Sequence, residues 1–150
     1  MTLSRFATAF LVTSALAIAP ALAADNVAID QTMTIAGIET ACTGVGLEAR
    51  EDAKWRSWPL LVEVVGKQGQ MLGDTTVTVS GNGHDVAMHC SGPWSLMKLP
   101  AGSYHISTDV AEGGHKEMNV KVPASGQTHL TVRYPNAGGA ESPDRVAANQ

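Results

Sequence analysis

From Trp58 onward, apolar and polar residues alternate in short segments that are separated by Gly, Pro, Asn or Asp. Alternation with a period of two is typical of β-strands that bury one face and expose the other. We expect seven such strands, in the following stretches of the printed sequence: 60–64, 76–80, 86–90, 94–96, 104–110, 118–122 and 130–134. The pattern predicts an all-β domain.

No long helical pattern interrupts these segments, and turn residues recur at roughly ten-residue spacing. Strands buried on both faces would read as continuous apolar runs, whereas these alternate. The sequence therefore predicts a seven-stranded antiparallel β-sandwich. A closed barrel is the alternative that this pattern leaves open.

Two segments precede the predicted strands. Residues 46–55 (GLEAREDAKW) form a poor strand pattern and a fair short helix, in which Leu47 and Trp55 are available for packing. The stretch 27–38 alternates weakly, and whether it adds an edge strand to the sandwich stays open. After Tyr134 the chain is small, polar and contains Pro and Gly, which predicts a disordered tail over 135–150.

The first residues are predicted to be a signal peptide. Arg5 precedes an apolar run over 6–19, and Ala21-Leu22-Ala23 presents the small residues that signal peptidase recognises. The run is shorter than the roughly 20 residues that a membrane span needs. We expect cleavage after Ala23, which divides the chain into a signal peptide (1–23), an N-terminal segment (24–41), the sandwich (42–134) and the tail (135–150). The mature product is predicted to be soluble and periplasmic.

Charge limits the choice of partner. The chain has 10 Lys and Arg against 14 Asp and Glu, a formal net charge of −4, and loss of Arg5 with the signal peptide makes it more negative by one. This mild acidity argues against nucleic acid as a partner.

The chain has two cysteines, Cys42 and Cys90. An even number of cysteines in a protein bound for an oxidising compartment indicates a disulfide. A thiolate nucleophile or a metal-ligand pair would favour closer spacing or a CxxC motif. We therefore predict a structural Cys42–Cys90 disulfide.

A Leu-x-x-Gly-x-Tyr run lies between two predicted strands, at Leu99, Gly102 and Tyr104. This is the sequence form of a tyrosine corner, in which a buried ring sends its hydroxyl back to a main-chain group a few residues upstream. Gly102 supplies the backbone freedom that the turn needs. The role of this motif is structural.

The run Ser91-Gly92-Pro93-Trp94, followed by this corner, resembles the carboxypeptidase regulatory-like domain of prealbumin-like topology. The likeness extends to small exported proteobacterial proteins that carry the domain alone, since 44–46 (GVG) and the acidic stretch 48–52 match their N-terminal part. It covers about 42–134. The resemblance implies a Greek-key sandwich, an accessory role without enzyme activity, and a division of the seven strands into first, fourth and seventh against second, third, fifth and sixth.

The same topology occurs in hydroxyisourate hydrolases, which end in Tyr-Arg-Gly-Ser and carry an early catalytic His. Here the last predicted strand ends in Arg133-Tyr134-Pro135, and no His precedes His84. The departures fall on the residues that perform the reaction, so we predict that the chain lacks this activity.

The histidines and methionines could suggest a metal site, but their positions favour a purely structural interpretation. The five histidines and Met88 or Met97 suggest a metal site, yet no HxH or HxxxH motif occurs, and His105 and His129 are expected in different sheets. His84 and His115 are expected in turns. The histidines concerned are His84, His89, His105, His115 and His129. We predict no bound metal and no cofactor.

Catalytic and sugar-binding patterns are equally weak. No Gly-x-Ser-x-Gly motif occurs, and Glu63 and Asp109 are strand positions expected to face outward. Trp55, Trp58 and Trp94 could form a sugar platform, although each stands where a core or capping aromatic is expected. We predict no catalytic residue.

The sequence thus favours a non-catalytic periplasmic accessory module that binds a protein partner through a sheet edge or a loop end. A module that binds carbohydrate or an envelope polymer, and a metal-handling protein, are the alternatives. An exposed aromatic strip would favour the first alternative, and converging His or Met side chains the second.

Overall fold

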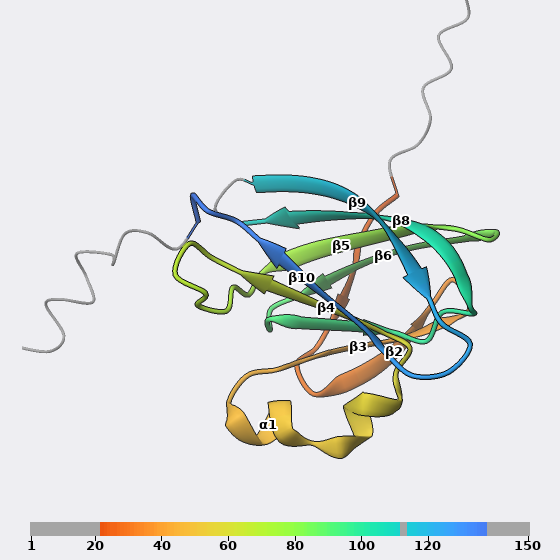
Figure 1. Ribbon diagram of the computed structural model, residues 1–150, viewed down its shortest axis with the longest axis horizontal. Helices are drawn as coiled ribbons and strands as arrows, with labels where there is room; N and C mark the ends of the chain where they lie inside the picture. The colour runs from red at the N-terminus through yellow and green to blue at the C-terminus, as the bar shows by residue number, and fades with distance from the viewer. Residues whose placement is uncertain (1–21, 112–113, 138–150) are drawn as a thin grey trace, which may run out of the picture.

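The structure of the chain is a computed structural model that describes residues 22–111 and 114–137 (Figure 1). The predicted signal peptide, apart from its last two residues, lies outside the described residues, and so does the predicted tail from residue 138 on. In the described part of the chain, no helix is both long and apolar enough to cross a membrane.

Each of the seven expected segments forms a strand. They are β4 (Leu60–Val65), β5 (Thr75–Gly81), β6 (His84–Cys90), β7 (Trp94–Met97), β8 (Gly102–Val110), β9 (Gly114–Val122) and β10 (Thr128–Arg133). Alternating burial follows the expected phase, because Val77 and Val79 are buried while Thr76 and Thr78 are only partly covered. The period-two pattern was therefore sufficient to place these strands.

Three further strands precede the helical segment. They are β1 (Asp25–Val27), β2 (Gln31–Ile35) and β3 (Ile38–Thr43). The expected number of seven is thus wrong for the described chain. The weakly alternating stretch 27–38 does contribute an edge strand, and the sandwich begins well before residue 42.

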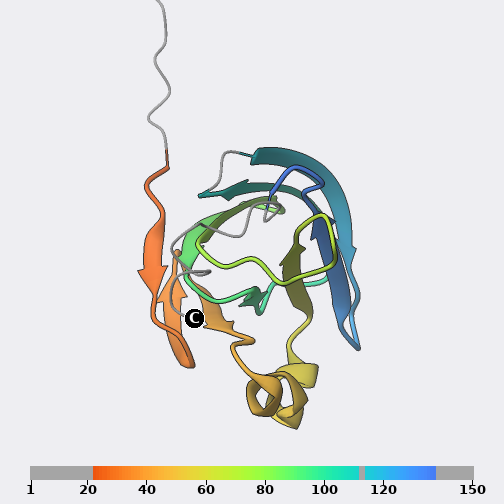
Figure 2. The ribbon, with the colours of Figure 1, turned by 90° about the vertical axis from the view of Figure 1, so that its left-hand side faces the viewer.

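The strands form two five-stranded sheets, sheet A in the order β1-β6-β5-β8-β9 and sheet B in the order β10-β4-β7-β3-β2. The expected division of the seven strands is confirmed, since β4, β7 and β10 share sheet B while β5, β6, β8 and β9 share sheet A. The protein is an all-β sandwich with helical turns on one side (Figures 1 and 2).

The expectation of purely antiparallel sheets is wrong. β1 pairs with β6 in parallel, and β10 pairs with β4 in parallel. Both are edge strands that enter their sheet from elsewhere in the chain rather than through a hairpin, so a tight turn does not set their direction. The alternation of side chains has the same period in either direction and could not distinguish them.

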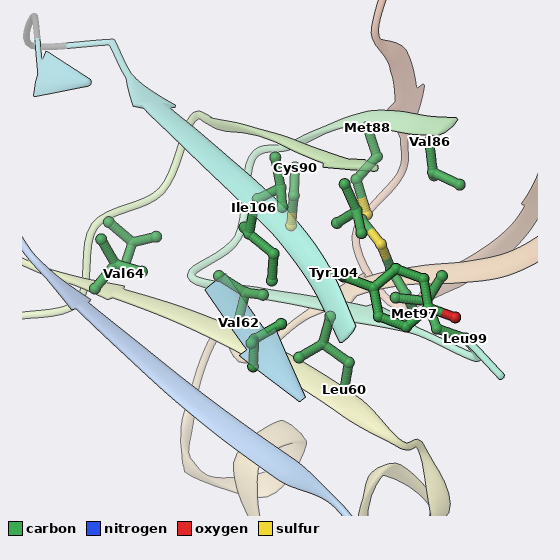
Figure 3. Packing of buried hydrophobic residues seen from close by; sticks show 14 of the residues in the cluster. Leu60, Val62, Val64, Val86, Met88, Cys90, Met97, Leu99, Tyr104 and Ile106 are labelled. Carbon is green, nitrogen blue, oxygen red and sulfur yellow. The ribbon is translucent and has the colours of Figure 1, made fainter. Parts of the chain in front are cut away.

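The main core lies between the sheets. Leu60, Val62 and Val64 of β4 belong to one buried cluster with side chains of β6 and β8, including Val86 and Ile106 (Figure 3). All five are at most 1% exposed. This single apolar layer is what the one-sided strands predict.

A second, smaller core covers the outer face of sheet B. It consists of Ala41, Trp55, Trp58, Leu61, Trp94 and Leu96. Trp55 comes from the 3-10 turn (Ala53–Ser57), which follows α1 (Leu47–Glu51); α1 itself has no buried residue. The outer face of sheet B is therefore closed to solvent over its central strands, whereas outward residues of β2 and β10 are exposed.

The expected helix over 46–55 is broken in two. Asp52 has extended backbone angles, φ −61° and ψ 116°, and its side chain accepts a hydrogen bond from the Lys54 amide at 3.0 Å. Asp competes with the helical backbone for hydrogen bonds in this way, so it ends α1 and caps the following turn. Leu47 is 62% exposed, so only Trp55 packs as expected.

The predicted disulfide is present and joins the two sheets. Cys42 of β3 and Cys90 of β6 are bonded at an S–S distance of 2.02 Å, and both residues are 0% exposed. The N-terminal segment runs alongside, because Val27 pairs with Cys90 and Ile29 bridges to Cys42. This segment crosses from sheet A to sheet B over the disulfide.

Two aromatic contacts fix the chain near its predicted corner and tail. Tyr104 is 2% exposed and its hydroxyl donates to the Pro100 carbonyl at 2.6 Å, which is the contact expected of a tyrosine corner. Tyr134 is buried, and its hydroxyl donates to the Thr108 carbonyl at 2.7 Å. Ala137 is 5% exposed and accepts a hydrogen bond from the Lys67 amide, so the first residues of the predicted tail are ordered.

Candidate functional site

The histidines are spread over both sheets, as expected for His105 and His129. His105 lies on β8 of sheet A and His129 on β10 of sheet B. His84 and His115, expected in turns, lie within β6 and β9 instead. Within 22–111 and 114–137, no group of three or more His, Cys, Asp or Glu side chains has an arrangement that could hold a metal ion.

A row of charged side chains follows the outer face of β8 and β9. His115 Nδ1 lies 2.7 Å from Asp109 Oδ1, and Glu117 Oε1 lies 3.5 Å from His115 Nε2 and 3.7 Å from His105 Nε2. The hydrogen bond to Asp109 is the main cause that raises the pKa of His115 above its usual value, and the negative charges of Asp109 and Glu117 add to it. These side chains are about half exposed, so the row is solvated rather than enclosed.

Glu63 is the one strand carboxylate that is largely covered, with a side chain only 13% exposed. It faces the outer side of sheet B as expected, but Trp94 Nε1 donates to Glu63 Oε2 at 2.7 Å and His129 Nε2 lies 3.4 Å from the same oxygen. The carboxylate is thus held between two strands, and no nucleophile stands beside it in these contacts. Sequence reasoning missed this contact because it did not anticipate the second core on this face.

A hollow of about 280 Å³ opens at one end of the molecule. It is lined by Gly114, His115, Lys116, Tyr134, Pro135, Asn136 and Ala137. The Tyr134 hydroxyl is bonded to Thr108 and His115 to Asp109, so their polar groups are already engaged. Among its described lining residues, the hollow brings together no set of groups typical of a catalytic centre.

The tryptophans do not form an exposed strip. Trp55 and Trp58 are each 4% exposed and Trp94 is 9% exposed. Lys54 and Lys98 lie over the faces of Trp55 and Trp58, at 4.6 and 4.7 Å from the ring centroids. Ring faces covered in this way are not available for stacking on a sugar.

The feature of the molecule best suited to binding is the edge formed by β2. This strand pairs with β3 through a two-residue turn at Ala36 and Gly37, and β3 is its only partner among the described strands. Its first four residues are exposed, and Met33 is 41% exposed. Figure 2 shows β1 and β2 together along one side of the sandwich.

The turn determines which backbone groups of β2 face outward. In a two-residue hairpin the flanking pair, here Ile35 and Ile38, exchanges both backbone hydrogen bonds, and the pairs then alternate. Met33 therefore bonds toward β3, whereas the N–H and C=O groups of Thr32 and Thr34 point away from it. These two residues present an ordered row of donors and acceptors.

No protein-family model matches the chain, and a search of curated proteins found no match.

Proposed function

We propose that the chain is a non-catalytic accessory module that binds a protein partner by adding an extended segment of that partner to sheet B beside β2. The exposed, singly paired β2 is the observation that carries this proposal. Strand addition of this kind draws its affinity from main-chain hydrogen bonds and its specificity from alternate side chains.

The four edge strands differ in how well they are protected. β9 carries charged residues, and on the same side of the sandwich Thr128 of β10 donates its hydroxyl to the Lys121 carbonyl at 2.8 Å, linking the two sheets. β1 is only three residues long. β2 (QTMTI) is longer and has no charged residue and no Pro, which are the usual means of blocking an edge.

The alternatives have less support. A carbohydrate-binding platform would need exposed aromatic faces, and those of Trp55 and Trp58 are covered. A metal-handling role would need converging ligands. His105 and His115 both lie near Glu117, but no group of three or more His, Cys, Asp or Glu side chains within 22–111 and 114–137 could hold a metal ion. Binding through the main chain at an edge needs neither.

The proposal also covers the domain family of the chain and the cellular compartment in which it works. We also propose that the seven strands β4–β10 form a Greek-key, prealbumin-like core of the carboxypeptidase regulatory-like type. The strands β1–β3 precede this core. The division of the strands between the sheets supports this. We further propose that the mature chain begins at Ala24 and works in the periplasm, which the apolar run 6–19 and the buried disulfide support.

In-cell crosslinking tests the binding proposal. A photoreactive phenylalanine analogue in place of Thr34 is expected to give an adduct with a second protein. The same analogue in place of Thr78, on the outer face of sheet A, serves as the matched control and is expected to give none. Equal adducts from the two positions, or none from Thr34, would contradict the proposal.

A second arm tests the hydrogen bonds themselves, with the photoreactive analogue moved to Thr32. Thr34→Pro removes the outward N–H at a position where an edge strand tolerates Pro, and it should abolish the adduct. Thr34→Val keeps the N–H and the β-branched shape, and the adduct should persist. Thermal unfolding of each variant checks that the sandwich is intact.

A further inference from the structure

The outward-facing backbone N–H and C=O groups of β2 are spaced so that two copies of the strand can bond to each other. Thr32 and Thr34 are two residues apart on either side of Met33, and both present an N–H and a C=O. If two copies of β2 approach antiparallel with Met33 opposite Met33, Thr32 of each copy lies opposite Thr34 of the other. In an antiparallel ladder, hydrogen-bonded pairs alternate with non-bonded pairs, so both Thr pairs can exchange their bonds.

We propose that β2 pairs in this way with β2 of a second copy of this chain, so that sheet B continues through both molecules. This interaction uses the same edge as the proposed function but requires no other protein. A partner segment would then compete with the second copy for the same backbone groups.

The side chains of the strand are compatible with this pairing. Thr–Thr pairs would lie on the outer face, where cross-strand threonines stabilise a sheet. On the inner face Met33 meets its counterpart, which covers a side chain that is 41% exposed. Gln31 lies opposite Ile35 and Asp30 opposite Ala36, so no like charges face each other even though each chain is acidic.

The contact between the two copies of β2 is small. A paired segment of five residues buries less than the roughly 1,200 Å² of a stable interface. The association is therefore weak and reversible, with a dissociation constant of about micromolar or higher. A longer partner segment can displace it.

Cysteine substitution at the centre of the pairing gives a geometric test. Opposite residues in a non-bonded antiparallel pair have Cα atoms about 4.5 Å apart, within the range that a disulfide spans. Met33→Cys should therefore form a covalent dimer under mild oxidation.

Thr32→Cys is the matched control, because residue 32 of the second copy is a diagonal neighbour of residue 32 in the first, at about 7–8 Å. We expect Met33→Cys to crosslink about tenfold faster than Thr32→Cys. Cys42 and Cys90 are fully buried and bonded to each other, so they do not compete.

Adding Thr34→Pro to Met33→Cys should slow crosslinking to the rate of Thr32→Cys, whereas adding Thr34→Val should leave it unchanged. The thermal midpoint of each variant confirms folding, and Thr32→Pro replaces Thr34→Pro if the latter unfolds the chain. Equal rates for the cysteines at positions 33 and 32, or no effect of the proline, would overturn the proposal.

The outcome separates self-pairing from partner binding. If Met33→Cys gives no fast dimer while a photoreactive residue in β2 still captures another protein, self-pairing is wrong and the proposed function stands. If the dimer forms and no adduct with another protein appears, the reverse holds. The locked Met33→Cys dimer, with both edges occupied, should capture no other protein.

Discussion

Tyr104 illustrates how one side chain fixes a turn. Its ring is buried in the main core, and its hydroxyl reaches back four positions to the Pro100 carbonyl. Gly102 between them has φ +156°, a backbone conformation that residues with a Cβ rarely adopt. The corner therefore depends on both residues.

Tyr104→Phe should lower the free energy of unfolding by about 1–2 kcal/mol, because the Pro100 carbonyl loses its donor. Tyr104→Ala should cost more, about 3–5 kcal/mol, through loss of the buried ring. Urea unfolding of the two variants and the wild type measures both. If both changes were neutral, the corner would contribute nothing to stability.

His115 makes a pH-dependent contribution to stability. The carboxylates of Asp109 and Glu117 raise its folded pKa above the ordinary value of about 6.5. A raised pKa means that the folded state binds the proton more tightly, so this stabilisation is fully present below about pH 6.5 and is lost as the pH rises through the folded pKa.

NMR titration should therefore give His115 a higher pKa than in the variant Asp109→Asn. The difference in thermal midpoint between wild type and His115→Gln should be larger at low pH and shrink above the folded pKa. A wild-type pKa at or below that in Asp109→Asn would contradict the assigned cause.

At the scale of elements, the β2–β3 hairpin carries a mismatch between sequence and geometry. Its turn has positive φ at both positions, 49° at Ala36 and 79° at Gly37. Gly adopts such angles without strain, whereas a left-handed conformation costs a residue with a Cβ about 1–2 kcal/mol.

Ala36→Asn creates the Asn-Gly pair that this turn type prefers. It should raise the free energy of unfolding by about 1 kcal/mol, as measured by urea denaturation. Ala36→Val, which tolerates positive φ poorly, should lower it. Destabilisation by Asn would mean that the turn is not of this type in solution.

The disulfide joins a strand of sheet A to a strand of sheet B, so its loss should destabilise the whole sandwich. Replacing both Cys42 and Cys90 by Ala should lower the free energy of unfolding by up to about 4 kcal/mol, because the unfolded chain regains the entropy of a long loop. Urea unfolding without reductant measures the effect. An unchanged midpoint would mean that the bond does not restrict the unfolded chain.

The sequence predicted elements where one physical signal dominated. Strands β4–β10 followed from alternation, and the disulfide from an even cysteine count. The break at Asp52 was missed because a side-chain hydrogen bond to the Lys54 amide overrides a weak helical pattern. β2 stayed open because an edge strand that is exposed on most of its residues has little apolar alternation to read.

The position of the candidate binding site was the feature least well predicted from the sequence. A sheet edge was expected as the binding surface, but the edge concerned could be identified only once β2 was known to have β3 as its one partner in the described chain. The Glu63 contact with Trp94 and His129 joins residues far apart in sequence. Its only sequence signal was an acidic residue within an otherwise apolar strand.

At the scale of the whole molecule, the start of the mature chain matters because β1 begins at Asp25. We expect the exported protein to start at Ala24, with Ala21 and Ala23 filling the small-residue subsites of the peptidase. Intact-mass analysis of the native product decides this. A mass that retains Arg5 would show that the leader is not removed.

The crossing of the N-terminal segment over the disulfide imposes an order on maturation. Val27 and Ile29 lie against the two half-cystines, whose residues have no exposed surface. An oxidising enzyme can reach the thiols only while this segment is undocked, so oxidation must precede the seating of β1. Once seated, the segment shields the bond, and reductants should break it no faster than the segment undocks. The N-terminal segment therefore docks over the disulfide only after the disulfide has formed.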